Sequence, residues 1–142
     1  MKQRNHHFNF TIAIDNTIDK VWQSLIDVEK WHQWDTELIS ANLDGNFVLG
    51  AKGSMKPKTG PLLPFYISEF TPHQSYTINT KMPIGGLVIK RSLSTENGMV
   101  LFTDDIQFTG FLKLIFGVIL GGTFRKVLPE VMNNFKKMAE EK

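Results

Sequence analysis

Apolar and polar residues alternate near the start of the chain, and this pattern predicts a half-buried strand over Phe8–Ile14. Its apolar positions are Phe8, Phe10, Ile12 and Ile14. A short amphipathic helix is predicted next, with Asn16 as its N-cap and Asp19 near its N-terminus. Its apolar residues recur at helical spacing: Ile18, Val21, Trp22 and Leu25. A second short helix follows, with one apolar face formed by Trp31, Trp34 and Leu38.

Glycines and prolines punctuate the middle of the chain, and such punctuation indicates short strands joined by turns. The predicted strands are Ala41–Leu43, Phe47–Lys56, Leu63–Phe70, Gln74–Met82, Gly85–Ser94 and Met99–Phe108. Regular short strands of this kind are typical of an antiparallel meander. The segment Lys56–Pro64 holds three prolines and a glycine, so we predict a loop there.

The pair Asn97-Gly98 is the strongest two-residue hairpin signal in the chain, and it sets the register of the last two strands. With that turn at the centre, Arg91 faces Asp104 in a row that is otherwise apolar. The apolar pairs of this row are Leu93 with Phe102, Ile89 with Ile106, and Leu87 with Phe108. We therefore predict that Arg91 and Asp104 point into the core. On the opposite face, Lys90 and Asp105 are predicted to form a surface ion pair.

The last third of the chain, Gly110–Lys142, is predicted to form one long C-terminal helix. Its stripe of regularly spaced positions is Gly117, Gly121, Phe124, Leu128, Val131, Phe135 and Met138. The stripe begins with glycines and ends with bulky side chains, so it leaves room at its first half. Pro129 lies inside the predicted helix, and we expect a kink or a break near Arg125.

Composition narrows the class of protein. A chain of 142 residues is long enough to bury a core, and we predict one domain over residues 1–142. The net charge of +2 does not indicate nucleic acid as a partner. The chain has no cysteine, and the N-terminus lacks the apolar core of a signal peptide. The apolar run 111–120 is shorter than the ~20 residues of a spanning helix. A soluble, cytoplasmic protein is predicted.

Several segments resemble the START-like (SRPBCC) superfamily, in particular its polyketide cyclase/dehydrase-like branch. The matching segments are Ile18–Trp22, Leu25–Trp34, Gly98 with Thr103, Gly110, and Leu128–Pro129. The resemblance implies the α+β helix-grip fold (START/Bet v 1-like), in which a curved antiparallel sheet wraps around a long C-terminal helix and two short helices follow the first strand. It also implies an apolar cavity between sheet and helix. Members bind lipids, hormones, quinones, aromatic polyketides or sterol-like molecules, and some are cyclases.

The leading hypothesis is a protein that binds or carries a small hydrophobic ligand between the sheet and the first half of the long helix. Arg91 would bind a polar group of the ligand, Asp104 would orient Arg91, and Tyr76 would offer a hydroxyl. The predicted lining is Trp34, Phe47, Met55, Phe65, Tyr76, Ile89, Arg91, Phe102, Asp104, Ile106, Phe108, Leu114, Gly117, Val118 and Gly121. The plainer alternative is that these residues form only a core, a cross-strand ion pair and close helix packing.

Two other functions stay open at this point. The first is a cyclase or dehydratase acting on a polyketide-like substrate, with Arg91 or an inward-pointing Glu69 assisting proton transfer. The second is an interaction module that presents the apolar run 111–120 to a membrane or a protein. No catalytic residue, metal ligand set or cofactor motif is assigned, because His6-His7 lacks a third ligand and neither His32 nor His73 has a neighbouring carboxylate pattern.

Overall fold

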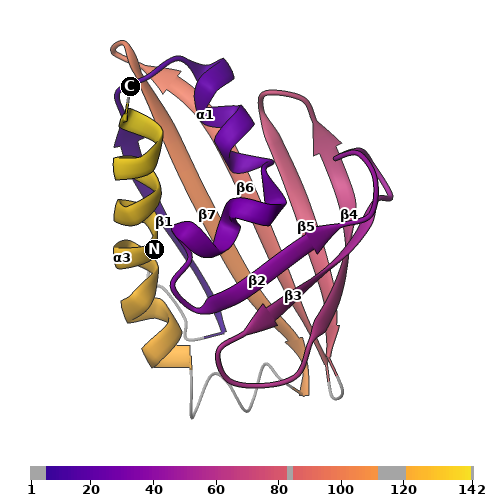
Figure 1. Cartoon of the computed structure of the whole chain (residues 1–142). Coiled ribbons are helices and arrows are strands. Elements are labelled where there is room, and N and C mark those ends of the chain that lie inside the picture. The colour runs from indigo at the N-terminus through magenta and orange to yellow at the C-terminus, as the bar shows by residue number, and fades with distance from the viewer. Residues whose placement is uncertain (1–5, 83–84, 112–120, 142) are drawn as a thin grey trace.

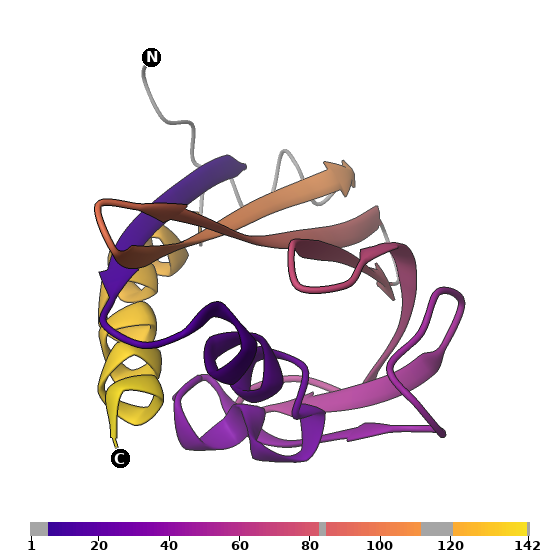
Figure 2. The same cartoon turned by 90° about the horizontal axis from the view of Figure 1, so that it is seen from above.

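The computed structural model describes residues 6–82, 85–111 and 121–141. Its sheet contains seven antiparallel strands in the order β1-β7-β6-β5-β4-β3-β2. The strands are β1 (His7–Ile14), β2 (Leu38–Leu43), β3 (Lys52–Pro57), β4 (Leu63–Thr71), β5 (Ser75–Met82), β6 (Gly85–Glu96) and β7 (Met99–Gly110). The helices are α1 (Ile18–Leu25), the 3₁₀ helix η1 (Val28–Gln33) and α3 (Gly121–Glu140). The sheet curls around one side of the molecule, and these helices lie on its concave side (Figure 1 and Figure 2).

The β6–β7 hairpin has the predicted register. Asn97 and Gly98 both have positive φ, as a type I′ turn requires. Arg91 pairs with Asp104, and the three apolar pairs of the same row are also as predicted. Lys90 and Asp105 are register partners on the outer face. The Asp105 carboxylate lies 3.1 Å from Nε2 of His7 in β1, and this hydrogen-bond contact takes the place of the surface ion pair predicted with Lys90.

Two strand boundaries differ from the prediction. β2 begins at Leu38, which the sequence pattern assigned to a helix, and β3 begins only at Lys52. The segment 47–51 is therefore part of a loop. Phe47 packs inward from this loop, 4.7 Å from the ring centroid of Tyr76, so its apolar character reflects anchoring of the loop and not strand pairing.

A bulge in β4 reverses the predicted orientation of Glu69. Phe65 and Ile67 are buried, so strict alternation would also turn Glu69 inward. The pairing with β5 shifts between Ile67 and Glu69, and after the shift Phe70 packs against Phe47. Glu69 is exposed and accepts a hydrogen bond from Thr77 Oγ1 at 2.7 Å. The prediction of an inward general base at this position is wrong.

The cap of α1 is one residue later than predicted. Thr17 is the N-cap, and its hydroxyl accepts a hydrogen bond from Lys20 N at 3.4 Å. Asn16 instead ties the two ends of the chain together, because its Nδ2 donates to the carbonyl of Ala139 in α3 at 2.7 Å. Trp31 of η1 and Trp34, the C-cap of that helix, are both buried, as expected for residues that share a face.

The helix predicted over Gly110–Lys142 is confirmed for Gly121–Glu140, and residues 112–120 lie outside the described part of the chain. β7 extends to Gly110, whose φ of +66° is outside the helical region, and α3 begins at Gly121. Leu128, Val131 and Phe135 are buried, as the stripe predicted. Of the predicted kink or break near Arg125, the break does not occur, because the helix is continuous through Pro129. Its apolar face is packed against the core, and such packing is the main source of helix stability in proteins.

Candidate functional site

Arg91 and Asp104 form a buried ion pair on the concave face of the sheet. Their side chains are 4% and 2% exposed, and Arg91 Nε lies 3.5 Å from Asp104 Oδ2. The long β6 and β7 strands place them opposite each other, and the row of apolar neighbours turns them inward. The structure thus confirms the predicted direction of both side chains.

Three aromatic side chains, from η1, the residue that follows it and β5, surround the guanidinium of Arg91. The rings of Trp31 and Trp34 each lie with their centroid 4.9 Å from Arg91 Cζ, an arrangement that favours a cation. Tyr76 is the register partner of Arg91 on β5. Its hydroxyl accepts a hydrogen bond from Arg91 Nη1 at 3.2 Å and donates one to the carbonyl of Leu25 at 2.8 Å. We call Arg91, Asp104, Tyr76, Trp31 and Trp34 the Arg91 cluster.

Four buried polar atoms, three of them in this cluster, have no hydrogen-bond partner among the described residues. They are Arg91 Nε, Asp104 Oδ1, Trp34 Nε1 and Thr80 Oγ1. A buried polar atom without a hydrogen-bond partner costs free energy. Each such atom in a folded protein therefore calls for a physical explanation. Arg91 Nε and Trp34 Nε1 are donors, and Asp104 Oδ1 is an acceptor. Together they can form hydrogen bonds with a ligand group that both accepts and donates.

Burial is the largest single influence on the pKa values of Asp104, Tyr76 and Arg91, but it decides the direction of the shift only for Asp104 and Tyr76. Loss of water raises the pKa of Asp104 to about 6, although Arg91 opposes this rise. Burial likewise raises the pKa of Tyr76 to about 12, so the phenol stays neutral. For Arg91, burial lowers the pKa, but Tyr76 and the carboxylates of Asp104 and Asp35 more than offset it, and the guanidinium stays charged.

Asp35 is a member of this environment that the sequence did not reveal. Burial raises its pKa, and the nearby Arg91 opposes the rise. One Asp35 carboxylate oxygen accepts a hydrogen bond from Glu37 N at 3.1 Å. Trp31 was likewise predicted only as a core residue. The only sequence signal for either was proximity to Trp34, and that signal does not specify a contact with a strand more than fifty residues away.

The other predicted lining residues lie in the core or outside the described part of the chain. The buried ones are Trp34, Met55, Phe65, Ile89, Phe102 and Phe108, and the half-buried ones are Phe47 and Ile106. Phe135 of α3 packs on Trp34 and Phe102, with ring centroids 4.9 Å and 5.0 Å apart. Gly121 begins α3. Leu114, Gly117 and Val118, and with them the first half of the predicted helix, lie outside the described residues.

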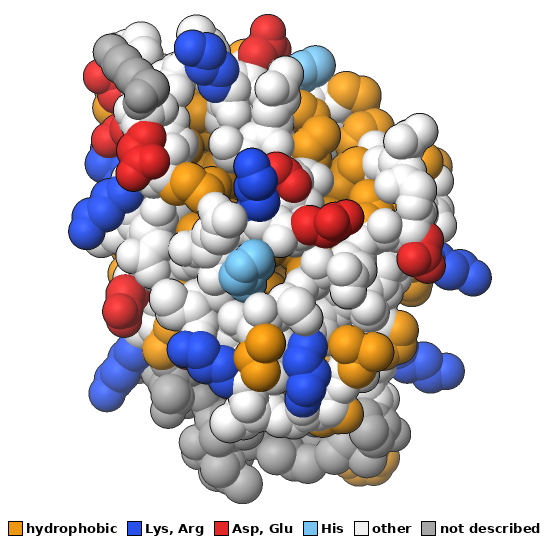
Figure 3. Space-filling view, viewed as in Figure 1, with side chains coloured by type: hydrophobic (Ala, Val, Ile, Leu, Met, Phe, Trp, Pro, Cys, Tyr) orange, Lys and Arg blue, Asp and Glu red, His pale blue; other side chains and the backbone are white. Residues whose placement is uncertain are grey.

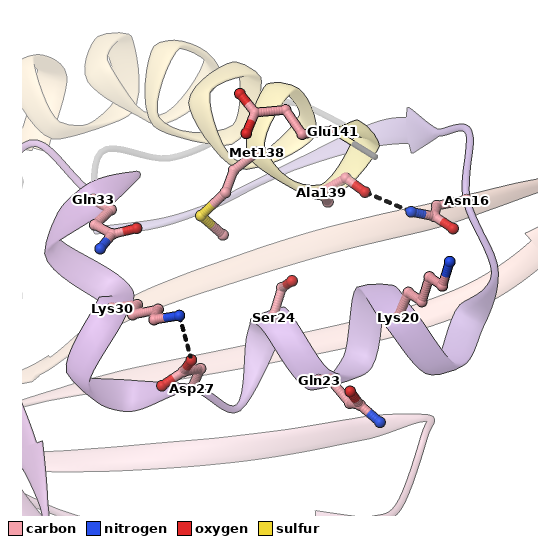
Figure 4. A pocket seen from close by; sticks show the side chains of 10 residues that line it. All are labelled: Asn16, Lys20, Gln23, Ser24, Asp27, Lys30, Gln33, Met138, Ala139 and Glu141. Carbon is pink, nitrogen blue, oxygen red and sulfur yellow. Dashed lines mark hydrogen bonds and ion pairs between the residues drawn. The ribbon is translucent and has the colours of Figure 1, made fainter.

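A separate surface pocket of ≈ 390 Å³ lies between α1, η1 and the C-terminal end of α3 (Figure 4). Sequence analysis did not predict it. Its lining is mostly polar: Asn16, Lys20, Gln23, Ser24, Asp27, Lys30, Gln33, Met138, Ala139 and Glu141. Lys30 is paired with Asp27 at 3.8 Å, and Lys20 and Lys30 are balanced by Asp27 and Glu141. This pocket therefore carries no net charge that would select a ligand.

Two of the histidines, His7 and His73, contact carboxylates that the sequence pattern did not indicate. His73 Nε2 lies 3.3 Å from Asp19 Oδ1, so the β4–β5 turn is joined to α1. Within residues 6–82, 85–111 and 121–141, no group of three or more His, Asp or Glu side chains is placed to hold a metal ion. Over the same residues, no helix is long and apolar enough to cross a membrane.

Comparisons with known proteins identify the fold. No family model and no curated protein matches the sequence. Among solved structures, the hypothetical protein jhp0584 from Helicobacter pylori has a TM-score of 0.78 at 8% identity, covering 96% of this chain and 89% of that one. Ara h 8.0201 has a TM-score of 0.69 at 11% identity, covering 94% and 97% of the two chains.

A longer protein also contains this fold. The di-domain ARO/CYC StfQ from the steffimycin biosynthetic pathway has a TM-score of 0.73 at 11% identity. The match covers 95% of this chain and 49% of StfQ, so this chain spans about half of that protein's length. Together with the curled seven-stranded sheet and C-terminal helix, these likenesses show the helix-grip, START/Bet v 1-like fold that the resemblance implied.

Proposed function

We propose that the protein binds a small, mostly apolar molecule inside the sheet, with one polar group of the ligand directed at the Arg91 cluster. The observation that carries the proposal is the set of unmatched buried atoms, Arg91 Nε, Asp104 Oδ1 and Trp34 Nε1. Small-molecule sites combine an apolar wall with a few placed polar groups, and this interior has that composition.

The polarity of these atoms suggests the kind of group that would bind. A carbonyl oxygen would accept from Arg91 Nε or Trp34 Nε1, and an adjacent hydroxyl would donate to Asp104 Oδ1. Hydrogen bonds to charged partners contribute roughly 1.5–3 kcal/mol each, so one such bond changes affinity by about ten-fold or more. A ligand that carries only hydrocarbon would leave the same atoms unmatched.

The first experiment asks whether a ligand is present. Native mass spectrometry of the freshly purified protein, followed by organic extraction, should show a co-purifying apolar compound. The protein should also take up a polarity-sensitive dye once that compound has been removed. A clean apo mass together with no dye uptake would rule out ligand binding in the interior.

The second experiment asks whether the Arg91 cluster recognises the polar group. The double variant Arg91→Met/Asp104→Leu keeps an apolar core, because a buried ion pair exchanged for hydrophobic side chains of similar volume often leaves stability unchanged. It should lose about ten-fold in affinity for the extracted compound while still taking up a hydrocarbon dye. The matched control is Lys90→Met/Asp105→Asn, which changes the outward-facing neighbours on the same strands. Equal losses in both variants would contradict the proposal.

A cyclase-type activity is the second candidate, and the observation that favours it is the raised pKa of Asp104. A carboxyl whose pKa is about 6, beside the Tyr76–Arg91 pair, can exchange a proton near neutral pH. In that case Asp104→Asn should abolish turnover of a poly-β-ketone chain and leave its binding intact. Binding without turnover by the unchanged protein would eliminate this candidate. Glu69 takes no part, because it is exposed on the outer side of β4.

A further inference from the structure

The loop between β2 and β3, residues 44–51, presents two adjacent large apolar side chains to solvent. Val48 is 50% exposed and Leu49 is 64% exposed. The loop projects from the right-hand side of Figure 2, on the side of the molecule away from α3. Hydrophobic side chains also gather in the upper right part of Figure 3.

The loop is held in this shape from within. The ring of Phe47 packs inward between Tyr76 and Phe70, with centroid distances of 4.7 Å and 5.8 Å. Backbone hydrogen bonds join Ala51 N to Val48 O at 3.0 Å and Gly50 N to Ile67 O at 2.8 Å. Because Phe47 occupies the inward position, the two side chains that follow it stay outside.

The charge and shape of the tip restrict its partner. The six residues Gly45–Gly50 carry no charged side chain, and the flanking Asp44 and Lys52 balance each other. A convex, uncharged tip whose backbone is partly hydrogen-bonded internally is suited to the boundary between lipid headgroups and acyl chains. Electrostatic attraction to an acidic surface plays no part in such a contact.

We propose that Val48 and Leu49 dock the protein reversibly onto a lipid bilayer, without a requirement for anionic lipid. Two side chains bury little apolar surface, so the contact is weak and the protein exchanges between membrane and water. The loop also connects this contact to the interior, because Phe47 touches Tyr76 and Tyr76 is bonded to Arg91. If a ligand passes from the bilayer to the interior along this connection, that step rests on the proposed function. Docking to the bilayer does not depend on the proposed function.

The test is co-sedimentation with phosphatidylcholine vesicles. The variant Val48→Ser/Leu49→Ser should lower the bound fraction by about ten-fold, because it removes most of the apolar surface at the tip. The matched control is Ile39→Ser, since Ile39 is 54% exposed but lies on β2 outside the loop. Adding phosphatidylserine should leave the binding of the unchanged protein as it was. A Val48→Trp variant adds a fluorescence signal, which should shift to the blue when the indole enters the bilayer. Trp22, Trp31 and Trp34 are buried, so their emission should not change with vesicles.

Other outcomes would overturn the proposal. Absence of vesicle binding, binding that requires phosphatidylserine, or equal losses in the loop and Ile39 variants would each do so. If the protein instead self-associates in sedimentation velocity and the loop variant abolishes this, the tip is an interface between copies of the chain. Vesicle binding without dye uptake would retain docking and eliminate the proposed ligand binding, and dye uptake without vesicle binding would do the reverse.

Discussion

At the scale of single residues, Asp104 shows how burial and charge compete. Burial disfavours the carboxylate, and Arg91 favours it, at a separation of 3.5 Å between Nε and Oδ2. Burial wins, and the pKa rises from 3.8 to about 6. Such a group binds a proton more tightly in the folded protein than in the unfolded chain, so protonation stabilises the fold.

This linkage predicts a pH dependence with a definite sign. The stabilisation is complete below pH 3.8 and is lost as the pH rises through about 6. Relative to Asp104→Asn, the unchanged protein should therefore lose stability over that window, by on the order of 3 kcal/mol. Urea unfolding at a series of pH values measures the difference. Asp44→Asn, at an exposed loop position, is the control, and parallel curves for wild type and Asp104→Asn would contradict the prediction.

At the scale of elements, β3 contains a position where only glycine fits. A Cβ on Gly53 would collide with the backbone oxygen of Asn42 and would lie 2.5 Å from Cζ of Phe65. The ring of Phe65 in turn packs on Trp31, with centroids 5.7 Å apart, and Trp31 lies against Arg91. Gly53 therefore lets β2 and β4 approach β3 closely, and this close approach positions Phe65 against Trp31 of the Arg91 cluster.

Gly53→Ala should lower the free energy of unfolding by roughly 1–3 kcal/mol, because a crowded core must shift to admit the methyl group. Urea denaturation gives the value, and near-ultraviolet circular dichroism reports the packing of Trp31. Ser54→Ala, at the next position of the same strand, should change stability by less than about 0.5 kcal/mol. An unchanged midpoint for Gly53→Ala would show that β3 can move away from Phe65.

The register of an element was predictable from sequence where the signal was local. The Asn97-Gly98 turn and the apolar row beside it set the pairing of β6 with β7 and so the positions of Arg91 and Asp104. The orientation of Glu69 was not predictable, because the bulge that reverses it arises from the pairing of β4 with β5. Alternation alone assumes an unbroken ladder.

At the scale of the whole molecule, hydrogen bonds join residues 13–16, at the end of β1 and just after it, to the C-terminal end of α3. Asn16 Nδ2 donates to Ala139 O at 2.7 Å, and Lys136 Nζ donates to Ala13 O at 2.6 Å. Glu140 joins the same group, since it accepts from Asp15 N and Lys136 Nζ, each at 2.8 Å. Chain segments more than 120 residues apart are thereby fixed to each other.

Asn16→Ala should lower the free energy of unfolding by about 1 kcal/mol, the typical net contribution of one hydrogen bond. Amide hydrogen exchange in the last turn of α3 should become faster, while exchange in β6 and β7 stays the same. Asn133→Ala changes the same residue type at an exposed position of α3 and should not speed exchange. Faster exchange across the entire sheet in Asn16→Ala would mean that these contacts support the global fold and not the helix end.

The sequence by itself determined the order of elements, the antiparallel sheet, the inward direction of Arg91 and Asp104, and the buried stripe of α3. These features depend on periodicity and on a turn signal between near neighbours in the chain. Tertiary structure alone decided that Trp31, Trp34 and Tyr76 meet at one guanidinium, that Asn16 reaches Ala139, and that Val48 and Leu49 stay outside while Phe47 turns in. Each of these depends on contacts between distant segments, whose relative positions are set by how the whole sheet curls and packs, and no local pattern specifies them.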